Sequence, residues 1–294
     1  MHTFTSGSLE KAALKAAALG ANTFQIFSAS PRMWRARPPD PEQIKRLRAA
    51  RRRFDLRPLA IHVNYLINLA SNDRTVRAKS IEAFRGELER AAVIGAECLV
   101  LHPGNYKGQS VEEGITAFVL GLKEAAAGLA RQVRRRMPAV LLENTAGSGA
   151  SLGSRLEELQ AMRELARDLT DLDVGFCLDT CHLLAAGFDV ATAIGLRDTV
   201  RAIERTIGWT PVRLIHANDS KTPRGSRVDR HAHIGKGYIG LEAFRRILTH
   251  PKLRSKPFIL ETPVDEPGDD RKNLDTLKAL SAPRSTKARL LQPV

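Results

Sequence analysis

A stretch of twenty residues, His216–Gly235, carries side chains whose types and spacing could bind metal ions. It follows the apolar run Pro211–Ile215 and contains three histidines and two aspartates. Imidazoles and carboxylates that directly follow a hydrophobic strand are typical of metal sites. Four cations lie among them and indicate that the group meeting the metal is an anion: Lys221, Arg224, Arg227 and Arg230.

Potential ligands also end six of the seven short apolar runs that we expect to be β-strands: His62, His102, Glu143, Asp179, His216 and Glu261. Taken singly, each has an ordinary explanation, because a histidine at a strand end is often a hydrogen-bonded core residue and an aspartate is often a helix N-cap. Several carboxylates that face one another beside apolar strands need cations or protons. Bound metal ions would meet that need.

Two further pairs extend the set of candidate ligands. Asp179 and His182 leave one strand end in a short turn and could serve neighbouring ions. Asp229 and His231 are two residues apart, so an extended backbone would point both side chains to the same side. His233 shares this parity, and spacing alone does not decide between His231 and His233.

The elements that position these residues alternate along the chain. Segments with apolar residues at helical spacing separate the apolar runs, and they include Leu9–Leu19, Pro41–Phe54, Thr75–Ile94 and Gly114–Arg136. Gly20 and Gly95 stand where helix C-caps are expected. The predicted strands are Thr23–Ser28, Pro58–Val63, Glu97–His102, Ala139–Glu143, Val174–Asp179, Pro211–His216 and Phe258–Glu261.

Near-continuous apolar strands that alternate with helices predict a parallel sheet covered on both faces. Residues 1–280 show no linker, so we expect one α/β domain, a (β/α)8 TIM barrel whose strand ends meet at one mouth. The first of the eight strands is short or missing, because only Met1–Ser6 precedes the first helix, unless the true start lies upstream. The basic tail Ser281–Val294 is predicted to be flexible.

The composition indicates a polyanionic partner, because the formal net charge is +14 and the isoelectric point is near 10.2. Two basic runs, Arg46–Arg57 and Arg131–Arg136, are expected to be mostly solvated faces of outer helices. The three cysteines form no CxxC pair, which argues against disulfides and against a thiolate zinc site. No apolar stretch is long enough to span a bilayer and no signal peptide opens the chain, so a soluble, cytoplasmic protein is expected.

Six blocks of the sequence resemble the successive signatures of the endonuclease IV family. The members of this family are zinc-dependent apurinic/apyrimidinic endonucleases of base excision repair. The resemblance runs from about residue 2 to residue 280, and the order of the blocks makes it specific. The blocks are IHVNYLINLAS (61–71), LHPGNY (101–106), LLENTAGSG (141–149), CLDTCHLLAAGFD (177–189), HANDSKTPRGSRVDRHAHIG (216–235) and ILETP (259–263).

The resemblance implies an (α/β)8 barrel with a trinuclear zinc cluster at its mouth. Glu143 would bridge two ions, Glu143 and Glu261 are expected to be catalytic, and His231 is preferred over His233. Manganese or iron at one position stays open, because mixed histidine and carboxylate ligation suits several metals. The nine ligands would divide among three ions as His62, His102 and Glu143; Glu143, Asp179, His216 and Glu261; and His182, Asp229 and His231.

The resemblance also implies how duplex DNA with abasic sites would be held. The family inserts side chains into the base stack and turns the abasic sugar out into the pocket, and Arg32, Tyr65 and Leu66 stand at the matching positions. The four cations of His216–Gly235 would bind phosphates. The opening HTFTSGSLEKA (2–12) departs from the family at Ser8, which replaces a glycine, and the loop Ser28–Pro31 also diverges.

The implied activity is hydrolysis of the phosphodiester 5′ to an abasic site by metal-bound hydroxide, which leaves a 3′-hydroxyl and a 5′-deoxyribose phosphate. Removal of blocked 3′ ends by a monomeric enzyme is also expected. One alternative is a sugar isomerase or epimerase with a single divalent metal, which leaves the third ligand group and the positive charge unexplained. Another is a DNA-binding barrel without catalysis, which would require degraded metal sites.

Overall fold

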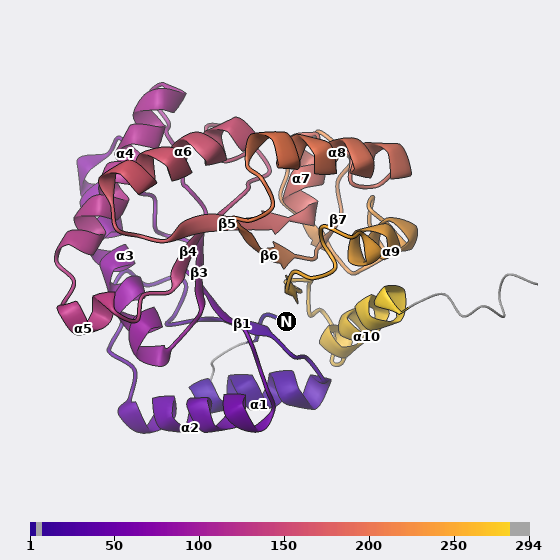
Figure 1. The fold of residues 1–294 in the computed structure, drawn as a ribbon, viewed down its shortest axis with the longest axis horizontal. Helices are drawn as coiled ribbons and strands as arrows, with labels where there is room; N and C mark the ends of the chain where they lie inside the picture. The colour runs from indigo at the N-terminus through magenta and orange to yellow at the C-terminus, as the bar shows by residue number, and fades with distance from the viewer. Residues whose placement is uncertain (4–7, 283–294) are drawn as a thin grey trace, which may run out of the picture.

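The centre of the fold is a parallel sheet of short, buried strands (Figure 1). The computed structural model describes residues 1–3 and 8–282. Every residue of the first five strands is buried, as expected for parallel strands covered on both sides. In sheet order the strands are β1 (Phe24–Phe27), β2 (Leu59–His62), β3 (Cys98–Leu101), β4 (Ala139–Glu143), β5 (Val174–Asp179), β6 (Val212–His216) and β9 (Phe258–Ile259).

The segment Met1–Thr3 occupies the place of the missing first strand. His2 forms a parallel bridge with Gln25 of β1, and Thr3 N–H donates to the Gln25 carbonyl at 2.8 Å. On its other side, His2 N–H donates to the carbonyl of Leu260, directly after β9, at 2.8 Å. The segment therefore links the two edges of the sheet, and the predicted barrel with a very short first strand is confirmed. Residues 4–7 of the expected first strand and family opening lie outside the described residues.

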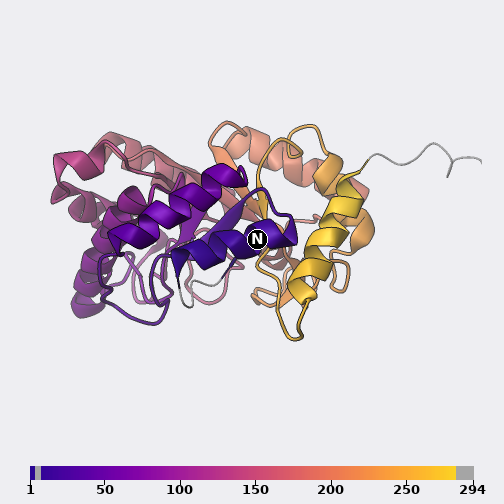
Figure 2. The same ribbon diagram turned by 90° about the horizontal axis from the view of Figure 1, so that it is seen from below.

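Helices surround the sheet on its outer side (Figures 1 and 2). Gly20 and Gly95 cap their helices at φ +78° and +83°, the left-handed region that favours glycine, as predicted. The described residues include no helix long and apolar enough to cross a membrane. The helices are α1 (Leu9–Leu19), α2 (Pro41–Arg53), α3 (Arg74–Ile94), α4 (Val111–Ala127), α5 (Arg131–Arg134), α6 (Leu156–Leu169), α7 (Thr180–Ala186), α8 (Ala193–Thr206), α9 (Leu241–Thr249) and α10 (Asp269–Ser281).

One helical prediction differs from the structure. The segment Gly114–Arg136 carries a helical pattern throughout, yet α4 ends at Ala127 and Gly128 is its C-cap. The chain resumes only as the short helix α5, while Leu129 between them is buried. Glycine is a poor helix former, so Gly128 favours an end to the helix, and the turn that follows buries Leu129.

The inside of the barrel is filled by a small cluster of buried residues. Two of its members are cysteines, Cys98 and Cys177, and burial raises the pKa of both thiols to about 12, so they act as apolar packing groups. A larger core lies between the sheet and the helices. The interior cluster consists of Ala60, Cys98, Val100, Ala139, Leu141, Cys177, Leu214 and Ile259.

The described residues end at 282, so the predicted flexible tail lies almost wholly outside them.

Candidate metal centre

The sheet directs the strand-end candidates into the mouth of the barrel. Successive side chains on a strand point to opposite faces, so residues two apart share a face. Each candidate lies two positions after a residue of the interior cluster and keeps its inward direction: His62, His102, Glu143, Asp179, His216 and Glu261. The alternation that fills the barrel therefore also brings these six side chains to its mouth.

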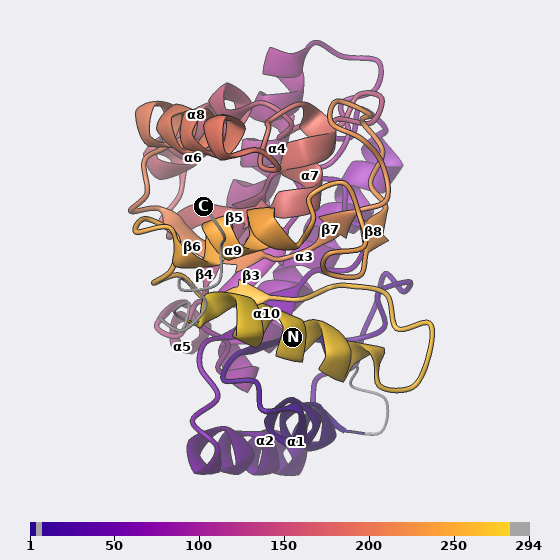
Figure 3. The same ribbon diagram turned by 90° about the vertical axis from the view of Figure 1, so that its right-hand side faces the viewer.

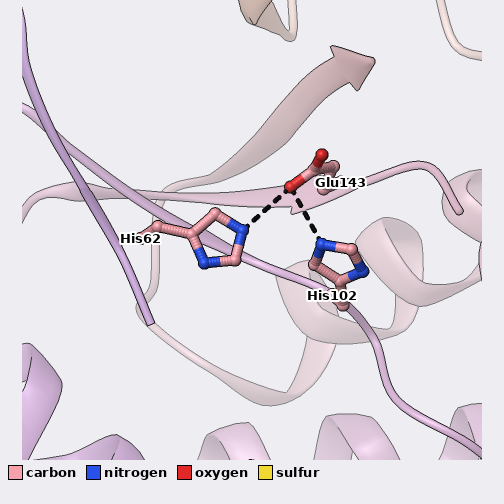
Figure 4. A group of neighbouring side chains, drawn as sticks. All are labelled: His62, His102 and Glu143. Atoms are coloured by element: carbon pink, nitrogen blue, oxygen red, sulfur yellow. Dashed lines mark hydrogen bonds and ion pairs between the residues drawn. The ribbon is translucent and has the colours of Figure 1, made fainter. Parts of the chain in front are cut away.

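Glu143 stands at the centre of this arrangement. Its Oε2 lies 3.1 Å from His62 Nε2 and 3.3 Å from His102 Nε2 (Figure 4). Its Oε1 lies 2.9 Å from His216 Nδ1 and 3.4 Å from His182 Nδ1. Burial alone would raise the pKa of this fully buried carboxyl, but the surrounding imidazoles hold the pKa well below its usual range. Glu143 is therefore a carboxylate shared by four histidines.

The structure gathers nine side chains into three neighbouring groups. Within each group, one potential ligand atom from every residue lies within 4.8 Å of the others. Glu143 belongs to two groups, which matches the bridging position expected from the family resemblance. The three groups of these nine residues are His62, His102 and Glu143; Glu143, Asp179, His216 and Glu261; and His182, Asp229 and His231, while a fourth group, Asp179, Cys181 and His231, overlaps the last two.

Asp179 serves the local fold and the site at once. Its Oδ1 accepts the backbone N–H of His182 at 2.8 Å and so caps α7. Its Oδ2 accepts a hydrogen bond from Asn218 Nδ2 at 2.6 Å and belongs to the cluster. One oxygen of Asp179 therefore caps a helix, the ordinary role of an aspartate at a strand end, and the other oxygen faces the cluster as a candidate metal ligand. The same cap places His182 one turn into the helix and over the mouth.

Hydrogen bonds to the main chain orient the histidines. His62 Nδ1 donates to the Val63 carbonyl at 2.8 Å, and His182 Nδ1 donates to the Asn144 carbonyl at 2.9 Å. His231 Nδ1 donates to the Glu261 carbonyl at 3.1 Å. Each ring therefore turns Nε2 towards the mouth, and histidines that bind metals usually fix their second nitrogen in this way.

Two of these rings test whether the site suits a metal. Nε2 of His182 and of His231 is buried and forms no hydrogen bond within the described part of the chain. Both atoms nevertheless face the Asp229 carboxylate, at 3.1 and 3.3 Å. Burial would lower the pKa of His231, but Asp229 and Asp179 raise it to about 9. Buried nitrogens that converge on a carboxylate without hydrogen-bond geometry fit a shared divalent cation, and nitrogen with oxygen ligands suits zinc.

The choice between His231 and His233 depends on a small hairpin. Strands β7 (Asp219–Ser220) and β8 (His231–Ala232) pair Ser220 with His231 and direct the His231 ring into the mouth. The His233 ring accepts a hydrogen bond at Nδ1 from Asn273 of α10 at 3.0 Å, and its Nε2 lies 3.5 Å from Asp265. His233 therefore contacts α10 and the loop before it, and not the mouth, although its even spacing from His231 would place both side chains on one side of an extended strand.

Asp219 anchors the chain that carries this hairpin. Its buried carboxylate accepts backbone hydrogen bonds of 2.8 to 3.2 Å from five residues, Ser220, Gly235, Gly237, Ile239 and Gly240. A Cβ at Gly237 would lie 2.2 Å from the Ser220 carbonyl oxygen, so only glycine fits there. Asp219 was not among the predicted site residues, because its role depends on backbone N–H groups of Gly235 to Gly240, which only the fold brings to it.

Gln25 was also not predicted as a site residue. Its side chain forms hydrogen bonds with two candidate metal ligands. Its Oε1 accepts from His216 Nε2 at 2.9 Å, and its Nε2 donates to Glu261 Oε1 at 2.6 Å. This bond leaves His216 Nδ1 facing the carboxylates. A buried amide in the middle of the apolar strand β1 was the available signal, because such a group needs partners.

Two asparagines that follow strand-end ligands were missed in the same way. Asn144 Oδ1 accepts the Asp179 N–H at 2.7 Å. Asn218 donates to Asp179 and accepts the Glu261 N–H at 2.8 Å. Both amides hold neighbouring strand ends in register around the cluster. Their place in the blocks ENTAG and HAND was the signal that could have identified them.

A cavity of about 330 Å³ opens beside the cluster, and its lining includes His62, His182 and Asp229. Tyr65 stands at this cavity with 68% of its surface exposed, and its ring centroid lies 5.3 Å from that of Phe27. Leu66 is half-buried. Tyr65 N–H donates to the Pro31 carbonyl at 3.2 Å, so exposed Arg32 belongs to the adjacent loop. Of the three predicted DNA-contacting residues, Tyr65 therefore lines the mouth, Leu66 follows it in the chain, and Arg32 lies in the adjacent loop.

The four predicted phosphate-binding cations lie in the loop between β7 and β8. All four are exposed, and none forms an ion pair with another described residue. The loop rests on the end of α7, since Arg227 N–H donates to the Ala185 carbonyl at 3.0 Å. The cations are Lys221, Arg224, Arg227 and Arg230.

Known proteins are similar to this chain in sequence and in fold. Residues 13–280 match the family described as xylose isomerase-like TIM barrel. A probable endonuclease 4 of Solibacter usitatus is 69% identical, and the match covers 96% of each chain. Endonuclease IV of Thermus thermophilus superposes with a TM-score of 0.82 at 36% identity and covers 95% of this chain and 97% of its own. A D-tagatose 3-epimerase-like protein shares the fold alone, with a TM-score of 0.68 at 22% identity over 95% of this chain and 96% of its own.

Proposed function

Because the chain belongs to the endonuclease IV family, we propose that it cleaves duplex DNA 5′ to abasic sites. Hydrolysis of that phosphodiester leaves a 3′-hydroxyl and a 5′-deoxyribose phosphate, and removal of blocked 3′ ends is a related activity of the same site. We propose a monomeric, cytoplasmic enzyme. The observation that carries the proposal is the convergence of nine histidine and carboxylate side chains into three neighbouring groups, two of which share Glu143.

Three zinc ions are the occupants that these groups suit best. The first group offers two imidazoles and one carboxylate, the second offers one imidazole and three carboxylates, and the third offers two imidazoles and one carboxylate. When bound by these residues, such ions would supply a water that ionises near neutral pH and positive charge for the phosphoryl and leaving oxygens. Three divalent cations and four carboxylates leave a net positive charge, which favours a phosphodiester in the mouth.

The chain itself must hold DNA in register with the cluster. The exposed cations of the β7–β8 loop can pair with phosphates on either side of the lesion, which supplies affinity without base recognition. Tyr65 at the cavity, with Leu66 next in the chain and Arg32 in the adjacent loop, would enter the base stack. The cavity beside them can receive an extruded sugar that carries no base. Extrusion is cheapest where no base is stacked or paired, so abasic sites are favoured.

Within the cluster, Glu143 and Glu261 have separate roles. Glu143 holds the two inner groups together through both carboxylate oxygens. Glu261 lies at the edge of the mouth, with 17% of its side chain exposed, and is fixed by Gln25 and His216. It can therefore meet the reacting phosphodiester directly.

A sugar isomerase or epimerase is the alternative on the same barrel. The D-tagatose 3-epimerase-like structure shares the fold, but at 22% identity this likeness does not extend to activity. A single-metal sugar enzyme leaves the group His182, Asp229 and His231 without a purpose. It also leaves the four unpaired cations of the β7–β8 loop unexplained.

One assay separates the candidate functions. The purified protein is incubated with an end-labelled duplex that carries one abasic site, with and without a chelator, and with zinc restored after chelation. We expect nicking on the 5′ side of the lesion that chelation stops and zinc restores. Turnover of a ketose without nicking would favour the sugar enzyme, and tight binding without cleavage would favour a non-catalytic DNA-binding barrel.

A further inference from the structure

We propose that the protein has a second DNA-binding surface, which holds the sugar–phosphate backbone of an undamaged duplex segment away from the metal centre. This surface, the outer groove, is a hollow of about 820 Å³ between α2, the end of α3 and α5. Ile44, Val93 and Val133 form part of its apolar lining. Its cations are Lys45, Arg48, Arg52, Arg131, Arg135 and Arg136.

The outer groove joins the two basic runs of the sequence. Arg46–Arg57 contributes through α2, and Arg131–Arg136 contributes through α5 and the turn that follows it. Arg48 Nη2 donates to the Val93 carbonyl at the end of α3 at 2.6 Å, which fixes α2 against that helix. The runs were expected to be mostly solvated faces of outer helices. The fold also places both on the walls of one hollow.

The outer groove has no matching negative charge of its own. No carboxylate residue is among its lining residues in the described part of the chain. Of its six cations only Lys45 has an ion pair with a described residue, and that contact to Glu42 is long, at 3.9 Å. By contrast, Asp198 of α8 accompanies Arg197 and Arg201. Like charges gathered without counter-charge repel one another, so an anionic partner gains by binding there.

The exposure of these side chains favours a DNA backbone over a small phosphate compound. Lys45, Arg52, Arg131, Arg135 and Arg136 are all exposed, and they are spread over different segments. A site for one small phosphate is usually compact and enclosed, often with main-chain N–H groups at a helix start. Exposed cationic side chains along an open groove suit successive phosphates of a duplex, which they contact without reading sequence.

The outer groove lies at the other end of the barrel from the metal centre. Several of its residues lie where helices end and the chain returns to the start of the next strand: Arg52 at the end of α2, Val93 at the end of α3 and Arg135 directly after α5. The candidate metal ligands instead follow or end the strands. Figure 3 shows the same separation, with α5 at one side of the molecule and the β7–β8 hairpin at the other. The groove therefore holds a different DNA segment from the one at the mouth and could keep the enzyme on DNA between lesions.

A matched pair of triple variants tests this inference. Arg52→Gln, Arg135→Gln and Arg136→Gln together remove three charges from the outer groove. Arg197→Gln, Arg201→Gln and Arg205→Gln remove three exposed charges from α8, so both variants have the same net charge. The mouth of each protein is first saturated with a short, unlabelled abasic duplex in chelator, which prevents cleavage. Binding of a fluorescent undamaged duplex is then followed by anisotropy across a range of salt concentrations.

We expect wild type and the α8 variant to bind the second duplex with similar salt dependence. The groove variant should bind it weakly, and the slope of log K against log salt should fall by about 2 to 3, close to 0.9 for each lost phosphate contact. Nicking of the short abasic duplex should be unchanged in both variants. Equal losses in both would mean that only net charge acts, and no loss in the groove variant would remove the site. Preference for single-stranded RNA over the duplex would exclude DNA as the partner.

This inference rests on the proposal that DNA is the substrate, yet the two can fail separately. Binding of the undamaged duplex needs no cleavage and no metal. A protein that nicks abasic DNA but binds no second duplex keeps the proposed function and loses the outer groove. A protein that binds the second duplex without any nicking does the reverse.

Discussion

Glu143 has more contacts to candidate ligands than its neighbours in the cluster, because both of its oxygens face imidazoles. Glu143→Ala should abolish cleavage and lower the number of metal ions bound, since two groups lose a shared ligand. The control is Glu124→Ala, which removes an exposed carboxylate of α4 paired with Arg77. Metal analysis and the nicking assay measure both effects. Cleavage within a few-fold of wild type would exclude Glu143 from the mechanism.

Gln25 tests whether the residues that support the ligands matter. Gln25→Leu removes the amide that orients His216 and Glu261, and we expect metal affinity to fall about 10- to 100-fold, as for other groups behind metal ligands. The control Thr23→Val also removes one hydrogen bond near β1, the bond to the Pro58 carbonyl, but lies away from the cluster. Competition with a chromophoric chelator gives both affinities. Equal metal affinities in the two variants would mean that Gln25 does not support the metal ligands.

Tyr65 tests the assignment of the DNA-contacting loop. Its ring is largely exposed beside the mouth, so Tyr65→Ala should weaken binding of an abasic duplex by about 1–3 kcal/mol, the range for one aromatic stacking contact. Tyr65→Phe keeps the ring and should bind nearly as well as wild type. Metal content should stay unchanged in both variants. Loss of metal on substitution to alanine would mean that Tyr65 supports the cluster through its contact with Phe27.

At the scale of elements, the β7–β8 hairpin depends on one buried carboxylate. Asp219→Ala leaves five backbone N–H groups without their acceptor, and a loss of about 3 kcal/mol in the free energy of unfolding is expected. Asp219→Asn keeps one acceptor oxygen and should cost less. Because the hairpin carries His231, metal binding by the third group should weaken as well. Urea unfolding and metal titration check the pair, and an unchanged midpoint in both variants would contradict this role.

The elements were largely predictable, and the exceptions have physical causes. The strands follow from short apolar runs, because burial on both faces requires such a composition. The break between α4 and α5 was missed, because helical spacing continues across Gly128 and only the burial of Leu129 decides the turn. The first strand was found only in part, since three residues carry no periodicity and gain their place from two neighbouring strands.

At the scale of the whole molecule, the cluster joins ligands from opposite sides of the barrel. Metal removal should therefore lower the melting temperature while circular dichroism still shows a folded barrel. A ligand at about 100 times its dissociation constant adds about 2.7 kcal/mol of stability for each site. Differential scanning calorimetry before and after chelation measures this effect. Identical transitions would mean that the nine side chains hold no structural metal.

The pH dependence of this stabilisation has a defined sign. In the metal-free chain the pKa of His231 is about 9 and those of His182 and His216 are raised, so these imidazoles bind protons that metal must displace. Their raised pKa stabilises the metal-free fold below about pH 6.5, and that contribution is lost as the pH rises through about 9. The difference in melting temperature between loaded and stripped protein should therefore widen over this window. Calorimetry at several pH values measures it, and a difference that narrows would contradict the assignment.

The sequence alone determined the parallel barrel and the set of strand-end side chains, because both follow from short apolar runs that alternate with helical segments and end in potential ligands. It also assigned the nine candidate ligands to three groups through the family resemblance. The tertiary structure decided how His231 and His233 differ, which amides hold the ligands, and that two distant basic runs line one groove. These depend on contacts between segments far apart in the chain, and spacing along a single segment carries no information about its neighbours.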